Sequence, residues 1–164
     1  MKELHTTLLI VRKENKILLA RKKRGFGFGK WNGIGGKVEE NETPEEAMIR
    51  ETQEEISVTP MEYDKIGIIK FVEYIKEELT TNYMHLYTTT KWKNTPRESE
   101  EMQPQWFSIE HLPWNEMFDD DKYWLPLVLV GKKLNAYFQY DKNWNLLKYK
   151  VEEQKDKQEK ETMV

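Results

Sequence analysis

Residues 35–58 read GGKVEENETPEEAMIRETQEEISV, and the centre of this stretch predicts a helix. Thr43 is a good N-cap residue, and Pro44 suits the first position of a helix. Glu46 follows the cap by three residues and completes a capping box. We therefore expect a helix to begin at residue 44.

The charge of this helix is unusual for a surface helix. At about 100° per residue, Met48 and Ile56 fall on a stripe that would face a core. Glu51, Glu54 and Glu55, at positions i, i+3 and i+4, crowd one side of the helix beside that stripe, where they should repel one another. Clustered carboxylates at a partly buried position suit a hard divalent cation such as magnesium. The alternative is a solvated acidic face without a bound ion.

Glycines lie just upstream of the helix. Gly33, Gly35 and Gly36 interrupt a strand-like run and permit close approaches of the backbone that other residues cannot make. The loop could therefore bring a carbonyl oxygen to the same cation.

The stretch as a whole resembles the Nudix box, written G-x5-E-x7-R-E-U-x-E-E-x-G-U with U an apolar residue. Two positions depart from it, because Thr52 occupies an apolar place and Ser57 replaces the late glycine. The resemblance implies an α/β fold of the α/β/α sandwich type with a mixed sheet, divalent-metal dependence, and cleavage of a nucleoside diphosphate linked to another group. The positions that match are Gly36, Glu42, Arg50, Glu51, Glu54, Glu55 and Val58.

Length and composition set the wider frame. The 164 residues predict one domain over residues 1–151, followed by a charged tail over 152–164 that we expect to be disordered. The net charge of -3 favours a free nucleotide over a nucleic acid polymer. Without cysteine, thiolate sites and a cysteine nucleophile are excluded. No apolar run reaches the length of a bilayer span, so we expect a cytoplasmic protein, acting as a monomer.

Alternating and β-branched runs predict the strands, and an apolar run after three aspartates predicts a second helix with a bend or restart at Pro126. Phe71 and Glu73 share one face of their strand. We expect the three histidines to be structural or exposed. The expected strands span residues 6–11, 16–21, 65–75, 82–92, 102–107, 136–140 and 146–151, with a glycine-rich loop at 25–30 and a connection at 76–81.

The likeness extends beyond the box. The runs KKRGFGFGKWNGIGGKV, PRESEEMQPQWF and DDDKYWLPL are similar to those of the animal oxidised purine nucleoside triphosphate hydrolases, a subfamily of 8-oxo-dGTPases. This resemblance implies that Glu101 assists at the metal site and that Asn32, Asp120 and Asp121 read the purine edge. It also implies that the base pocket and its entrance are lined by Thr7, Lys22, Phe26, Phe71 and Phe118. Phe118 replaces the tryptophan of the subfamily, and Asp119 replaces a proline.

From the carboxylates follows a hydrolytic mechanism at phosphorus. Glu51, Glu54 and Glu55 are the expected metal ligands, and Mn²⁺ is expected to be able to replace Mg²⁺. The resemblance implies the Gly36 carbonyl and Glu101 as further contacts. Arg50 should pair with Glu42 and orient the loop before the helix. The expected products from an oxidised purine triphosphate such as 8-oxo-dGTP are the monophosphate and pyrophosphate.

Other functions remain open at this stage. They are a general nucleoside triphosphate pyrophosphatase, an ADP-sugar or dinucleoside polyphosphate hydrolase, and a non-enzymatic nucleotide-binding module. Of two adjacent aspartates in an aromatic pocket, one should hold its proton at a higher pH than a free aspartate would. We expect Asp120 to donate to a base carbonyl when it is protonated and to accept from a base amino group when it is ionised. The alternative is that the aspartates only cap the following helix.

Overall fold

The computed structural model describes residues 1–155, which contain nine strands, two α-helices and one short 3-10 helix. The helices are α1 (Pro44–Ile56) and α2 (Asp121–Leu129), and the 3-10 helix is Trp114–Glu116. The strands are β1 (Lys2–Lys13), β2 (Lys16–Lys22), β3 (Trp31–Asn32), β4 (Ile34–Lys37), β5 (Thr59–Ile75), β6 (Glu78–Lys93), β7 (Met102–Ser108), β8 (Lys133–Tyr140) and β9 (Leu146–Gln154).

All nine strands belong to one mixed sheet. Its main path runs β3-β2-β1-β6-β5-β8-β9, while β4 pairs with β1 and β7 pairs with β2. The pairs β1–β6 and β5–β8 are parallel, and the other pairs are antiparallel. The predicted mixed sheet is therefore confirmed.

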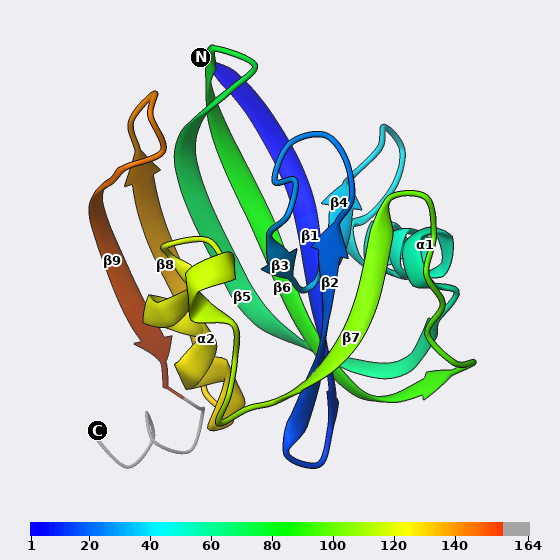
Figure 1. Ribbon diagram of the computed structural model, residues 1–164. Helices are drawn as coiled ribbons and strands as arrows, with labels where there is room; N and C mark the ends of the chain where they lie inside the picture. Colours follow the sequence, from blue (N-terminus) through cyan, green and yellow to red (C-terminus); the bar gives the residue numbers. More distant parts are fainter. Residues whose placement is uncertain (156–164) are drawn as a thin grey trace.

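The two helices cover opposite faces of this sheet (Figure 1). The side chains of β1 alternate between the two resulting cores. Leu8 and Ile10 pack in the cluster that includes Trp124 of α2, whereas Leu9 and Val11 pack in the cluster with α1. Successive side chains of a strand point to opposite faces, so a single strand contributes to both cores. This arrangement confirms the predicted α/β/α sandwich.

Helix α1 begins as its sequence predicts. The Thr43 side chain accepts a hydrogen bond from the Glu46 backbone, and the Glu46 side chain accepts one from the Thr43 backbone. The helix ends at Ile56, and its C-cap residue Ser57 has a left-handed backbone with φ 63° and donates its N–H to the Gln53 carbonyl. Serine thus adopts the conformation that glycine would take at this position of the box. Thr52, at the other departure, is buried and donates its hydroxyl to the Met48 carbonyl.

Several elements are longer than expected. Strand β5 starts at Thr59 instead of Lys65, because three register shifts let its polar first half continue the pairing with β6. Strand β6 starts at Glu78, since Lys76 and Glu77 alone form the turn. Strand β9 continues to Gln154, so residues 152–154 of the expected tail are ordered, and residues 156–164 lie outside the described part.

Helix α2 also differs from the expectation. It is continuous through Pro126, so the predicted restart is absent. The carbonyl that loses its donor is that of Lys122, an exposed residue in the first turn, where water can replace the missing bond. Among residues 1–155, no helix is long and apolar enough to cross a membrane.

Candidate active site

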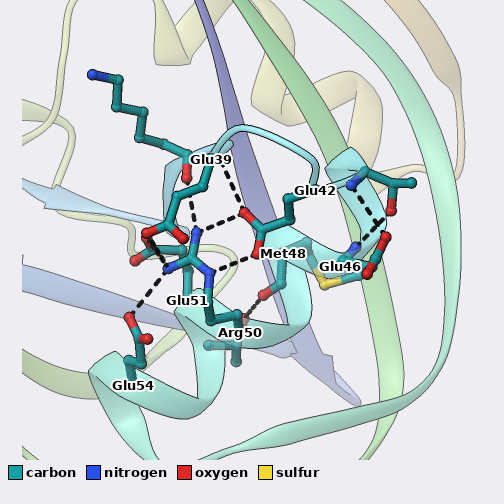
Figure 2. A network of polar contacts seen from close by, with 10 residues as sticks. Glu39, Glu42, Glu46, Met48, Arg50, Glu51 and Glu54 are labelled. Carbon is teal, nitrogen blue, oxygen red and sulfur yellow. Dashed lines mark hydrogen bonds and ion pairs between the residues drawn. The ribbon is translucent and has the colours of Figure 1, made fainter.

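Arg50 binds both the loop before α1 and the carboxylates on α1 (Figure 2). Its guanidinium donates to both oxygens of Glu42, at 2.7 and 2.9 Å, and to the Lys37 carbonyl at 3.0 Å. The same group reaches Glu51 at 2.9 Å and Glu54 at 3.2 Å. The Arg50 hydrogen bond lowers the pKa of Glu42 to about 2. The predicted pairing of Arg50 with Glu42 is present, and it fixes the loop against the helix.

Glu55 is the most buried carboxylate of this helix. Its side chain lies beside Glu51, and within the described residues its Oε2 is buried without a hydrogen-bond partner. Burial, and then the charge of Glu51, raise the pKa of Glu55 to about 8. An isolated buried carboxylate with a free oxygen is costly unless a cation or a proton neutralises it.

Four of the five expected metal ligands line one cleft, and Gly36 is the one that is not among its lining residues. The cleft has a volume of about 310 Å³ and is bounded by Glu51, Glu54, Glu55, Glu101, Arg24, Ser99 and Glu100. Glu101 comes from the loop before β7, and its carboxylate contributes to the raised pKa of Glu55. The structure thus brings the loop glutamate to the glutamates of α1, as the resemblance implies.

These carboxylates do not form a ready-made metal cage. Over residues 1–155, no three acidic, histidine or cysteine side chains converge in that way. The Arg50 guanidinium holds Glu51 and Glu54 in their present positions.

Gly36 supports the fit of a cation to this cleft. A Cβ at Gly36 would collide with the Glu51 carboxylate, so only glycine leaves that carboxylate its place against the β4 backbone. The donor set here consists of oxygens only, including the free Oε2 of Glu55, and it carries excess negative charge. Such a set fits a hard divalent ion, with Glu51, Glu54, Glu55, Glu101 and the Gly36 carbonyl as the residues available to hold it.

A separate cavity of about 110 Å³ opens between the sheet and the start of α2. It contains six of the residues expected to bind the base, and they come from the loop after β2, from β3, from β5, from the segment before α2 and from the first residue of α2. Its lining residues are Leu8, Phe26, Asn32, Phe71, Glu73, Asn82, Met84, Phe118, Asp120, Asp121, Trp124, Tyr140 and Trp144.

The two aspartates of this cavity are buried and differ in their partners. Asp120 accepts hydrogen bonds from the Tyr140 hydroxyl at 2.6 Å and from Trp124 Nε1 at 2.8 Å. Asp121 accepts from the Phe118 backbone at 3.1 Å. Burial raises the pKa of both, and the charge of Asp120 raises the pKa of Asp121 well above its usual range.

This arrangement corrects the expected proton position. Both oxygens of Asp120 already accept hydrogen bonds, so Asp120 is held in the form that accepts. The proton that one of the two aspartates retains is therefore better placed on Asp121 than on Asp120. Asp120 also makes no side-chain cap to α2, although it is the N-cap residue by position. The capping alternative therefore does not hold for Asp120, whereas the bond from Phe118 to Asp121 closes the segment before the helix.

Aromatic rings form the mouth of the cavity. Phe26 is half-exposed, with its ring centroid 6.1 Å from Phe118 and 4.8 Å from Trp144. Trp144 lies between β8 and β9, outside the predicted strands and the predicted binding residues. Its ring centroid is 6.4 Å from that of Phe118, so a large aromatic ring stands beside the position where the sequence departs from the subfamily.

Two expected binding residues lie outside the cavity. Thr7 is buried on the face of β1 opposite to Leu8, and its hydroxyl has no partner within the described chain. Lys22 ends β2, and its charge acts on Glu55, which suits a phosphate contact better than a base contact. As expected, His5 and His85 are structural: their rings share a hydrogen bond of 3.1 Å, and burial lowers the pKa of His85 to about 4.

Sequence reasoning missed five polar or aromatic groups of the cavity, one of which is Trp124 of α2. Trp144 and Tyr140 come from the last hairpin, and Glu73 and Asn82 come from β5 and β6. The sequence does indicate Glu73, because it shares a strand face with Phe71, which was expected to line the base pocket. No signal pointed to Trp144, which adopts φ 62° in a turn.

Comparisons with known proteins agree with this geometry. The NUDIX domain model matches residues 1–128. The oxidized purine nucleoside triphosphate hydrolase of Danio rerio is 42% identical over 150 residues, which are 92% of this chain and 95% of that protein. The protein of the same name from Mus musculus is 40% identical over 147 residues, covering 90% and 93%. Among solved structures, a MutT protein from Bacillus halodurans is similar with a TM-score of 0.79 and 25% identity, over 91% of this chain and 97% of that one.

Proposed function

The chain belongs to the Nudix family, and from this membership we propose that it hydrolyses oxidised purine nucleoside triphosphates such as 8-oxo-dGTP. The products are the nucleoside monophosphate and pyrophosphate, and the biological role is sanitation of the nucleotide pool. The substrate is a free nucleotide, which a cytoplasmic monomer can process without a polymer or a membrane.

One observation carries the proposal: an acidic cleft and a purine-sized polar cavity are joined by a single short loop. Lys22, at the start of the loop, acts on Glu55 of the cleft, and Lys30, at its end, acts on Asp121 of the cavity. Between them Phe26 lies over the cavity. A nucleotide with its base in the cavity would therefore direct its phosphates along the two lysines toward the glutamates.

Family members generally use a divalent metal, and we propose Mg²⁺, or Mn²⁺ in its place, held by Glu51, Glu54, Glu55, Glu101 and the Gly36 carbonyl. When bound, such an ion neutralises phosphate oxygens and acidifies a water molecule. The residues of the chain supply the rest. Arg50 keeps Glu51 and Glu54 in position, and the cleft carboxylates accept the proton that the attacking water gives up.

The reaction balances with one water molecule. Its oxygen forms a bond to one phosphorus of the α–β anhydride, and the bridging oxygen leaves with the other phosphorus. Orthophosphate is not a direct product of this cleavage. Turnover in heavy-oxygen water identifies the phosphorus that is attacked, and direct release of orthophosphate from the triphosphate would contradict the proposed bond cleavage.

Glu55→Gln tests the cleft. The change keeps the shape of the side chain and removes its charge, and we expect kcat to fall at least about a hundredfold, or about 3 kcal/mol. Glu45→Gln, an exposed change on the same helix, is the matched control. Steady-state turnover of canonical and oxidised nucleoside triphosphates with saturating magnesium is the measurement. A folded Glu55→Gln enzyme with normal turnover would remove Glu55 from the mechanism.

A further inference from the structure

Glu73 is a buried carboxylate in the base cavity that the reaction does not require. It lies on β5 and is 6% exposed. Its Oε1 accepts a hydrogen bond from Asn82 Nδ2 on β6 at 3.4 Å, which is at the long limit for such a bond. The Thr6 hydroxyl donates to Asn82 Oδ1 at 2.8 Å, so the amide is oriented with its N–H groups toward Glu73 and the cavity.

Within residues 1–155, no lysine or arginine forms an ion pair with Glu73, and its one hydrogen bond is the long bond from Asn82. Burial and the charge of Asp120 raise the pKa of Glu73 to about 7. A buried carboxylate with a single long hydrogen bond can accept a stronger hydrogen bond from a donor on a ligand.

The cavity therefore has two polar walls from different elements. Asp120 and Asp121 stand at the start of α2, whereas Glu73 and Asn82 stand on the sheet. A purine likewise has two edges with hydrogen-bonding groups. If the aspartates take the edge that carries N1 and the exocyclic group, the sheet wall is left for the imidazole edge.

Oxidation at C8 changes this imidazole edge. Unoxidised guanine presents N7 as an acceptor. In 8-oxoguanine, N7 carries a hydrogen and becomes a donor, and C8 carries a carbonyl acceptor. A carboxylate beside an amide N–H offers an acceptor beside a donor, which complements the oxidised edge and repels the N7 lone pair of the unoxidised base.

We propose that Glu73 and Asn82 recognise the oxidised edge of the purine, Glu73 accepting from N7–H and Asn82 donating to O8. This inference rests on the proposed function and adds to it a direct discrimination between oxidised and normal bases. Glu73 and Asn82 are specificity-determining residues, and neither touches the phosphates.

The test compares kcat/KM for 8-oxo-dGTP and dGTP in the magnesium-loaded wild type, Glu73→Gln and the control Glu62→Gln. Glu62 is exposed on the same strand and pairs with Lys91 at 3.2 Å. A hydrogen bond to a charged acceptor predicts that Glu73→Gln lowers the preference for 8-oxo-dGTP over dGTP by about ten- to a hundredfold. Glu62→Gln should leave the preference unchanged.

A modified substrate supplies a test on the wild type alone. In 8-oxo-7-deaza-dGTP, a carbon replaces N7–H while O8 remains, and we expect a loss of about tenfold or more in kcat/KM relative to 8-oxo-dGTP. This measurement decides the matter even if Glu73→Gln does not fold.

The outcomes separate this inference from the proposed function. Equal turnover of 8-oxo-dGTP and its 7-deaza analogue overturns the inference and leaves the hydrolase standing. The same holds if Glu73→Gln loses activity on both nucleotides equally. If the wild type turns over no purine triphosphate with magnesium, the proposed function fails and the inference falls with it.

Discussion

Glu73→Gln should make the protein more stable at high pH, because Glu73 resists ionisation in the folded state. Glutamine keeps the shape of the side chain, and its carbonyl can still accept from Asn82 Nδ2. The substitution removes only the ability to ionise. Its effect on the free energy of unfolding should therefore depend on pH.

The magnitude follows from the pKa of Glu73, which rises from 4.5 to about 7, mainly through burial. Between these values the folded state binds more protons than the unfolded state, so the contribution of Glu73 to stability is lost as pH rises. A difference of about 2.5 pKa units corresponds to about 3 kcal/mol. Below about pH 4.5 the wild type and variant should be equally stable, and above about pH 8 the variant should gain most of this amount.

Urea unfolding at several pH values between 4.5 and 8.5 measures the difference directly. Glu62→Gln is again the control, since Glu62 is exposed, and its curve should follow that of the wild type. A stability difference that does not change with pH would refute the reasoning. A wild type that becomes the more stable protein at high pH would show that the folded state favours ionised Glu73.

Other substitutions test the remaining features. Gly36→Ala should lower kcat at least about tenfold in a steady-state assay, because its Cβ displaces the Glu51 carboxylate, and normal turnover would contradict that role. Trp144→Ala should raise KM for the nucleotide several-fold with little change in kcat, because it removes the ring that contacts Phe26; an unchanged KM would exclude Trp144 from binding. Ser57→Gly should raise the free energy of unfolding by about 1 kcal/mol without changing activity, because it relieves a left-handed serine, and thermal unfolding that shows no gain would contradict this strain.

The sequence predicted those features that depend on local order. The Nudix helix begins at Pro44 because the capping box is built from neighbouring residues, and its 3.6-residue period places Glu51 and Glu55 together. The core strands follow from their apolar residues. By contrast, the first half of β5 is polar and bulged, and it pairs with β6 only because the rest of the two strands already lie together.

The sheet wall of the cavity could not be predicted for a related reason. The position of Asn82 depends on the register of β5 and β6, in which Phe71 lies opposite Asn82. The register depends on the turn at Lys76 and Glu77, which both adopt positive φ, at 49° and 65°. Such two-residue turns favour asparagine and glycine, and a Lys-Glu pair gives no sign of one. The sequence therefore favoured a longer connection and left the partner of Glu73 undefined.

The two acidic groups Asp120 and Glu73 of the cavity differ in how many hydrogen bonds the protein gives them, and this difference affects how the cavity can bind a base. Asp120 is held by two donors of the protein, from Tyr140 and Trp124, so its position is fixed before any ligand arrives. Glu73 has one long hydrogen bond and a raised pKa, so it costs stability in the free protein. Burial without a partner is unfavourable for a carboxylate, and a base that brings an N–H removes that penalty on binding. Asp120, which the protein already holds by hydrogen bonds, can therefore orient the purine. Glu73 should add more binding free energy for an oxidised base, which supplies an N–H donor at N7, than for an unoxidised base, which does not.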